Sequence, residues 1–250
     1  MTLWQEMLVL LAGVGAGAIN TVVGSGTLIT FPVLLAVGVP PVTANVSNTV
    51  GLFPGSFVGA YGYRRELAGQ GRRVVRLGVA SALGAAAGAV LLLVLPPAAF
   101  NAIVPILIAL ALVLVVFGKQ LSAWLTRRRG HPVTVVTAPL WLATLFTGVY
   151  GGYFGAAQGV LLMAFLGLML SESLQRQNAL KNVLAGIVNL VAAVVFICSA
   201  HVDWQAVALV AAGSVVGGVI GARIGRRLSP PALRAIIVAV GVIALVKLLG

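Results

Sequence analysis

The sequence predicts an all-α, polytopic membrane protein built from two inverted repeats. Of its 250 residues, 60% are hydrophobic and 8% are charged, with a mean hydropathy of +1.12. Soluble domains carry about 25% charged residues. Apolar runs of membrane-spanning length recur along the whole chain, and an internal duplication divides it into two halves. These three observations predict the fold class.

Six apolar runs are each long enough to cross a hydrocarbon core as a helix. They cover residues 43–63, 74–95, 98–118, 179–200, 204–222 and 231–249. The stretch that opens each half differs, because it is interrupted at its centre by a glycine-rich segment, GVGAGAINTVVGSGT in the first half and GVYGGYFGAAQG in the second. Glycine lowers helix stability by up to about 1 kcal/mol per residue. We therefore expect two half-helices around a non-helical turn, forming either a re-entrant hairpin or two short spans.

The duplication has a constant offset of 133 residues, which aligns Gly26 with Gly159 and Asn45 with Asn178. The same offset aligns Gly84 and Gly88 with later glycines over a stretch of about 80 residues. Shared self-similarity of this kind indicates repeats. We predict a single membrane domain over 1–250, with repeat one at 4–118, a basic cytoplasmic linker at 119–134 and repeat two at 135–249.

The basic residues orient the repeats. Arginines gather in short loops between apolar runs, as the positive-inside rule expects, and this distribution argues against nucleic acid as a partner. Three segments are basic, with Arg64, Arg65, Arg72, Arg73 and Arg76 in the first, Lys119, Arg127, Arg128 and Arg129 in the second, and Arg223, Arg226, Arg227 and Arg234 in the third. The loop SAHVDW has no Lys or Arg. Each repeat then crosses an odd number of times, so the two are inverted, and both termini lie outside a bacterial plasma (inner) membrane.

Inverted repeats are typical of secondary transporters. The alternative is a duplicated membrane scaffold without a transport role. Irregular backbone at membrane depth is tolerated where it is buried or lines a wet cavity, and half-helix N-termini favour anions. The breaks therefore predict substrate-binding backbone donors at Gly24, Ser25, Gly26, Thr27, Gln158 and Gly159, with Asn20 beside them.

Close helix packing is the alternative for these glycines, and it fits Gly13 and Gly17 well. A second stripe, formed by Gly213, Gly217, Gly221 and Gly225, recurs every fourth residue. We assign this stripe to helix packing or to dimerisation, which makes a homodimer reasonable.

A polar stripe follows each break. Asn45, Asn48, Thr49 and Ser56 lie on one helix face, and the offset of 133 places Asn178, Lys181, Asn182 and Asn189 at the equivalent positions. Intramembrane polar residues usually line a substrate pathway. We expect the two stripes to face each other near the midplane and to bind a small oxyanion. Snorkelling is the alternative for Lys181, and an ion pair with Glu172 is the alternative for the further site residue Arg176.

The chain has four acidic residues, and none of them lies within a predicted span. The usual proton relay of a coupled pump is therefore missing. An anion leaving a negative-inside cell gains about 2.3 kcal/mol per charge per 100 mV, so export can run without a coupling ion. With one cysteine and no acid pair or HExxH motif, the sequence predicts no metal, no cofactor and no enzymatic activity.

The segment GAGAINTVVGSGTLITFPVLLAVGVPPVTANVSNTVG resembles the TauE/SafE family of bacterial sulfite exporters. The second copy, GVYGGYFGAAQGVLLMAFLGLML followed by RQNALKN, is similar to the family's second repeat. The resemblance covers essentially the whole chain. It implies export of sulfite or of organosulfonates such as sulfoacetate across the plasma membrane. A channel or an importer for similar anions is the alternative within the transport class.

Overall fold

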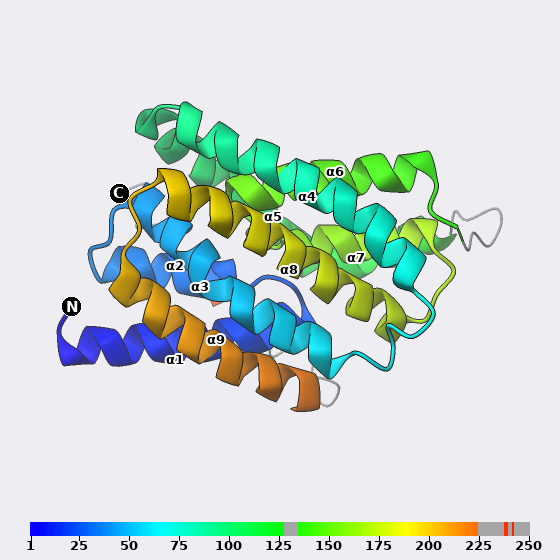
Figure 1. Ribbon diagram of the computed structural model, residues 1–250, viewed down its shortest axis with the longest axis horizontal. Coiled ribbons are helices and arrows are strands. Elements are labelled where there is room, and N and C mark those ends of the chain that lie inside the picture. Colours follow the sequence, from blue (N-terminus) through cyan, green and yellow to red (C-terminus); the bar gives the residue numbers. More distant parts are fainter. Residues whose placement is uncertain (128–134, 225–237, 240–241, 243–250) are drawn as a thin grey trace.

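The computed structural model describes residues 1–127, 135–224, 238–239 and 242, and this part contains nine assigned α-helices and no strand (Figure 1). They are α1 (Leu3–Val22), α2 (Thr27–Ala36), α3 (Pro41–Gly62), α4 (Gly71–Val94), α5 (Pro97–Arg127), α6 (Ala138–Tyr153), α7 (Gln158–Met169), α8 (Leu174–Ser199) and α9 (Trp204–Ile224). The all-helical class is confirmed. Gly225 lies outside the described residues. Of the predicted span at 231–249, the structure describes only residues 238, 239 and 242.

Five of the described helices are long and apolar enough to cross a membrane, namely α1, α4, α5, α8 and α9. The chain is therefore a multi-pass membrane protein. Helix α3 has the length, at 22 residues, but its polar stripe lowers its hydropathy. Helices α2 and α7 are short, with 10 and 12 residues. Helix α5 continues to Arg127, so helical structure extends into the segment that we predicted as a linker from residue 119.

Each opening stretch is broken as predicted, but the two parts are unequal. Helix α1 has 20 residues and stays helical through Gly13 and Gly17, whereas α2 has 10. The reason is packing, because a Cβ on Gly17 would lie 2.3 Å from Ser214 O of α9. Helix α2 then folds back along α1, since a Cβ on Gly26 would lie 2.7 Å from Ala16 O. The stretch is a helical hairpin rather than two half-length spans.

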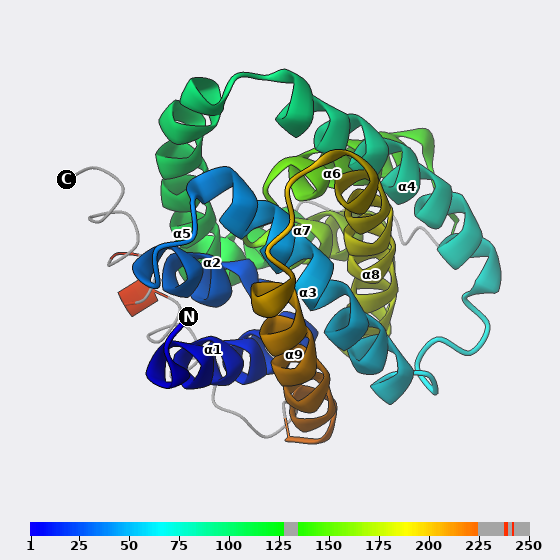
Figure 2. The same ribbon diagram turned by 60° about the vertical axis from the view of Figure 1, so that its left-hand side comes forward.

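One helix from each half of the chain packs among the helices of the other half. Helix α9 packs against α1 and α3, and α4 packs against α6 and α8, so each group combines both halves. Figures 1 and 2 show the pair α1 and α9 on one side of the molecule and the pair α4 and α6 on the other. Contacts between α3 and α8 join the groups. By the sequence offset of 133 residues, the pair α1 and α9 corresponds to α6 and α4, and the pair α3 and α9 corresponds to α8 and α4.

The glycine stripe on α9 is used inside the chain. A Cβ on Gly213 would lie 2.4 Å from Leu10 O, and one on Gly217 would lie 2.0 Å from Val14 O, both on α1. Gly221 faces Ala18 O at 2.7 Å in the same way. The packing interpretation is therefore confirmed for these three glycines, and they provide no dimer surface.

Helices α3 and α8 occupy equivalent positions in the two halves and run in opposite directions. Beyond the end of α3, Gln70 Nε2 donates to Arg176 O near the start of α8 at 3.1 Å. Beyond the end of α8, Asp203 N donates to Ser47 Oγ near the start of α3 at 2.9 Å. These two contacts fix opposite ends of the helix pair.

Candidate functional site

The two helix breaks touch each other in the interior. Gly159 N, at the start of α7, donates to Gly24 O between α1 and α2 at 2.9 Å. A Cβ on Gly24 would lie 2.3 Å from Gly159 Cα, and one on Gly159 would lie 2.4 Å from Gly24 Cα. Gly24 also has a φ of +88°, in the region that favours glycine. Backbone approaches backbone here at a distance that excludes side chains.

A cluster of aromatic rings lies next to the breaks. Phe31 of α2 meets Phe154 edge to face at a centroid distance of 5.2 Å, and Phe100 of α5 lies 6.2 Å from Phe154. All three are fully buried. Such contacts add about 0.5–1.5 kcal/mol per pair beyond the burial of area. The cluster gives the irregular backbone a rigid, apolar support.

Three of the six predicted backbone donors already donate within the chain, so their binding of a ligand stays a prediction that would require these bonds to be exchanged. The N–H groups of Gly24, Gln158 and Gly159 donate to Ile19 O at 3.0 Å, Gly155 O at 3.2 Å and Gly24 O at 2.9 Å. In the described part of the chain, the N–H groups of Ser25, Gly26 and Thr27 have no partner. The donors that remain are therefore those at the N-terminus of α2.

Lys181 is fully buried in α8 and reaches the broken end of α1. Its Nζ donates to Asn20 O at 3.0 Å and to Thr21 O at 3.2 Å. Its stem packs beside Gly159, with Cδ 3.0 Å from a Cβ placed there. The last carbonyls of a helix lack intrahelical partners and attract cations. Lys181 thus turns inward to the break and does not snorkel.

Three asparagines of the two stripes bind the broken helix of the opposite half. Asn178 Nδ2 and Asn182 Nδ2 donate to Thr21 O at 3.3 and 3.2 Å. In the equivalent arrangement, Asn45 Nδ2 donates to Tyr153 O, the last residue of α6, at 2.9 Å. Each stripe therefore caps the helix break of the other half of the chain.

Our expectation that the stripes face each other holds only at their last members. Asn189 Nδ2 donates to Ser56 Oγ at 3.2 Å, and these two residues are separated by the repeat offset of 133. Asn20 Nδ2 joins them by donating to Ser56 Oγ at 3.1 Å. Four earlier members bind carbonyls at the breaks instead, because unpaired carbonyls there compete for side-chain donors; they are Asn45, Asn178, Lys181 and Asn182.

Asn48, the equivalent of Lys181, binds within its own half. Its Nδ2 donates to Thr27 Oγ1 at 3.2 Å, and its Oδ1 accepts from Thr30 Oγ1. Sequence reasoning missed Thr30, although its spacing of three residues from Thr27 on a short helix was a usable signal. Thr49 Oγ1 donates to Asn45 O of its own helix at 3.0 Å, so the structure gives it a local role.

Arg176 is not brought to the breaks. Its Nε lies 2.7 Å from Glu172 Oε2, as the spacing of four residues predicts, and its Nη1 donates to Ala68 O at 3.1 Å. Arg73 binds the other carboxylate oxygen, Glu172 Oε1, at 2.5 Å. The hydrogen bond from Arg73, together with Arg176, lowers the pKa of Glu172. This network joins the loop after α3 to the start of α8.

Several buried polar atoms at the breaks have no hydrogen-bond partner in the described part of the chain. They are Ser25 Oγ, Gln158 Nε2, Asn45 Oδ1, Asn178 Oδ1 and Tyr153 OH. Sequence reasoning missed Tyr153, which lies inside the quoted glycine-rich segment. Buried polar groups in proteins are almost always bonded. The breaks thus hold both donors and acceptors that a bound molecule can use.

No carboxylate in the described residues pairs with Lys181. The chain has four acidic side chains, all within the described residues. Glu6 accepts from Gln205, Asp203 accepts from Ala206 N and Glu172 pairs with arginines. The fourth, Glu66, lies in the loop after α3. Within the described part of the chain, the fully buried lysine therefore has only neutral hydrogen-bond partners.

Broken helices that meet at a polar centre, within a multi-pass helical protein, are the construction of a membrane transporter. The chain belongs to the sulfite exporter TauE/SafE family, whose model matches residues 9–248. This is a family of transporters rather than of enzymes.

Relatives agree with this class. A "probable membrane transporter protein" of Haemophilus influenzae is 27% identical, covering 89% of this chain and 87% of its own. "Probable membrane transporter protein ORF9" of a Sinorhizobium species is 28% identical, covering 94% and 88%. "Probable membrane transporter protein YfcA" of Escherichia coli K12 is 24% identical, covering 94% and 86%. No solved structure matches the chain significantly.

Proposed function

We propose that the protein exports small oxyanions, most directly sulfite or organosulfonates, through a site where the two helix breaks meet. The observation that carries this proposal is the fully buried Lys181, whose hydrogen-bond partners among the described residues are two backbone carbonyls. A buried ammonium without a carboxylate is costly, because burial removes its hydration and no opposite charge replaces it. A small anion would supply that charge.

The groups around Lys181 suit an oxyanion. The amide donors of Asn178 and Asn182 share one acceptor, Thr21 O, with the lysine. An anion that attracts Lys181 Nζ would release this carbonyl to the two amides. The N–H groups of Ser25 and Gly26, at the N-terminus of α2, add donors and a favourable partial charge. Transport would thus couple anion binding to the cap that holds α1.

We further propose that the two halves are inverted in the membrane and give alternating access. The opposite directions of the equivalent helices α3 and α8 support this arrangement, as does the exchange of α4 and α9 between the halves. The basic loop after α3 is then cytoplasmic and both termini are outside. Export of an anion gains about 2.3 kcal/mol per charge per 100 mV of negative-inside potential.

Sulfite efflux from proteoliposomes, with a set membrane potential, tests the function. Lys181→Met removes the ammonium but keeps an apolar stem beside Gly159, and we expect it to lower efflux by at least about tenfold, the effect of roughly 1.4 kcal/mol. Arg72→Gln removes one exposed positive charge from the start of α4 and serves as the matched control, with wild-type flux expected.

Each alternative has its own outcome in the same assay. Equal efflux in Lys181→Met and wild type would remove Lys181 from the site. Efflux that ignores the membrane potential but follows an imposed pH gradient would contradict potential-driven export. A wild-type protein that folds in the vesicles but moves neither sulfite nor sulfoacetate would favour the scaffold.

A further inference from the structure

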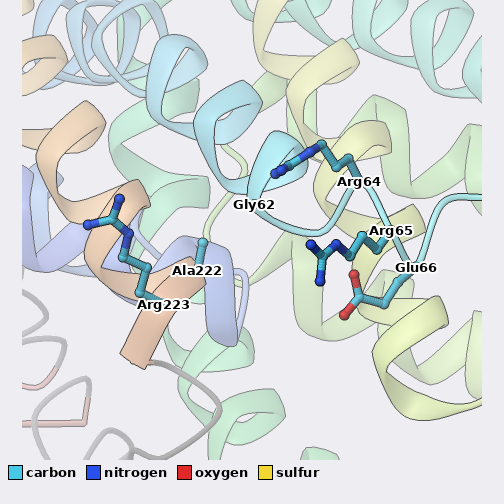
Figure 3. Close-up of a pocket in the computed structure, with 6 residues that line it drawn as sticks. All are labelled: Gly62, Arg64, Arg65, Glu66, Ala222 and Arg223. Carbon is cyan, nitrogen blue, oxygen red and sulfur yellow. The ribbon is translucent and has the colours of Figure 1, made fainter.

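A basic hollow lies where the ends of α3 and α9 meet, next to the glycines Gly59 and Gly221 that contact Thr21 of α1. Its volume is about 300 Å³, and it is lined by Gly62, Arg64, Arg65, Glu66, Ala222 and Arg223 (Figure 3). Helices α3 and α9 approach closely at this hollow, because a Cβ on Gly62 would lie 2.2 Å from Ala222 Cβ. Arg64 and Arg65 come from the loop after α3, and Arg223 comes from the last turn of α9. Two helix ends therefore contribute three arginines to the lining of one hollow.

Among the described residues that line the hollow, positive charges outnumber negative charges. Three arginines and one glutamate give a net charge of 3 − 1 = +2. Arg64 is held in place by Tyr61, with its guanidinium carbon 4.4 Å from the ring centroid and its Nη1 donating to Tyr61 O at 3.2 Å. Arg65 and Arg223 are exposed and form no ion pair within the described residues. The positive charge of the lining thus favours the binding of an anion.

Exposed apolar side chains lead along both helices to these arginines. On α9, Val216, Val219 and Ile220 are 51%, 36% and 37% exposed and precede Arg223 by seven, four and three residues, so they share its helix face. On α3, Phe57 and Tyr61 are exposed one turn apart. On membrane-spanning helices such faces contact acyl chains. A ligand for this site therefore has an anionic head and apolar tails.

The repeat provides an internal comparison. The offset of 133 places Ile197, Cys198 and Ser199 at the positions of Arg64, Arg65 and Glu66, and Val90 at the position of Arg223. The equivalent place at the opposite end of the molecule therefore carries no charge. The basic hollow belongs to one face, the one that the positive-inside rule assigns to the cytoplasm, where the leaflet is anionic.

We propose that this hollow binds the phosphate headgroup of an anionic phospholipid from the cytoplasmic leaflet, with the acyl chains along the exposed faces of α3 and α9. Arg65 and Arg223 contact the phosphate from two sides, and the ring of Tyr61 lies at the level of the headgroups, where aromatic side chains are enriched. Glu66 disfavours a free inorganic dianion, because its carboxylate adds a negative charge to the lining. The apolar faces favour a lipid over a free anion.

Native mass spectrometry of the purified full chain tests the proposal, with dioleoyl phosphatidylglycerol and dioleoyl phosphatidylcholine as the lipid probes. We expect preferential binding of phosphatidylglycerol to the wild type and an affinity about tenfold lower in Arg65→Gln/Arg223→Gln. The matched control, Arg72→Gln/Arg76→Gln, removes two exposed arginines from the start of α4, outside the hollow, and is expected to change affinity less than twofold. Arg65→Lys/Arg223→Lys keeps both charges and is expected to retain most of the binding.

Two results would overturn the proposal. Equal losses in the two glutamine double variants would mean that the lipid follows surface charge and not the hollow. Displacement of phosphatidylglycerol by millimolar inorganic phosphate or sulfite would mean that the hollow binds free anions. Size-exclusion profiles identify a misfolded variant, and the wild-type preference between the two lipids tests the proposal without any variant.

Discussion

Lys181 and Asn48 show how one residue difference separates the two halves at the same helical position. Asn48 holds the start of α2 in its own half, whereas Lys181 reaches the end of α1 in the other half. The longer lysine extends further than an asparagine and meets carbonyls that the break leaves open. Its charge then lies where the backbones of both breaks converge. The asymmetry gives a nearly symmetric framework one cationic position.

Sequence reasoning located these residues better than it assigned their roles. Lys181, Asn178 and Asn182 were predicted as a polar group at the centre, and the structure brings them to one carbonyl, Thr21 O. The partner was not predictable, because a side chain's choice among unpaired carbonyls depends on how two distant breaks meet. For the same reason, the sequence could not predict that the N–H of Gly159 donates to Gly24 O of the other break.

The contact between the breaks gives a prediction for Gly24→Ala, with Gly38→Ala as the matched control. Both glycines have a positive φ, of +88° and +92°, so both substitutions strain the backbone. A Cβ on Gly38 has no atom within 4 Å, whereas one on Gly24 meets Gly159 Cα at 2.3 Å. We expect Gly24→Ala to lower the unfolding free energy by about 1–3 kcal/mol more than Gly38→Ala, because inserting atoms into a filled space destabilises proteins by this amount. Denaturant titration in detergent measures the difference, and equal losses would contradict the contact.

At the scale of the helices, packing against α9 explains which glycines of α1 stay helical. Glycine-rich sequence alone predicted an interruption across residues 13–27, but the structure breaks only after Val22. Gly13 and Gly17 lie against α9, and this packing offsets their weak helix propensity. Sequence could find the break but not its edges, because the partner helix comes from the other half of the chain.

The equivalent packing of α1 on α9 and of α6 on α4 predicts equal costs for Gly217→Ala and Gly88→Ala. A Cβ on Gly217 would lie 2.0 Å from Val14 O, and one on Gly88 would lie 2.0 Å from Val149 O. Carbonyl groups within helices cannot move aside, so we expect each substitution to lower the unfolding free energy by about 1–3 kcal/mol. Thermal unfolding in detergent measures both.

Gly15→Ala is the control for these two substitutions. It lies on α1, the helix against which Gly217 packs, but a Cβ there meets Ile29 Cδ1 at an ordinary 4.0 Å. Alanine forms helices better than glycine by up to about 1 kcal/mol, so Gly15→Ala is expected to keep or raise stability. A loss at Gly15 equal to that at Gly217 would indicate a general intolerance of α1 to side chains and not a close helix contact.

At the scale of the whole molecule, the charged network fixes which helix ends share a face. Arg73 and Arg176 both bind Glu172, and Arg176 also binds Ala68 O, so the loop after α3 and the start of α8 lie together. At the other end, the N-terminal amino group of Met1 donates to Gln205 Oε1 at the start of α9. From loop charge, the sequence predicted only that the N-terminus and the loop SAHVDW lie on one side, because positive-inside patterning needs no knowledge of packing. It could not predict the bonds that lock them.

The single cysteine offers a direct test of orientation in the unmodified protein. Cys198 is exposed in the last turn of α8, next to the loop that lacks Lys and Arg, and we place it outside the cell. A membrane-impermeant maleimide added to intact cells is expected to label the wild-type protein and to leave Cys198→Ser unlabelled. Ala68→Cys in the Cys198→Ser background places a thiol at an exposed position of the opposite loop. That thiol is expected to react only after permeabilisation. Labelling in the reverse order would invert the topology and with it the proposed direction of transport.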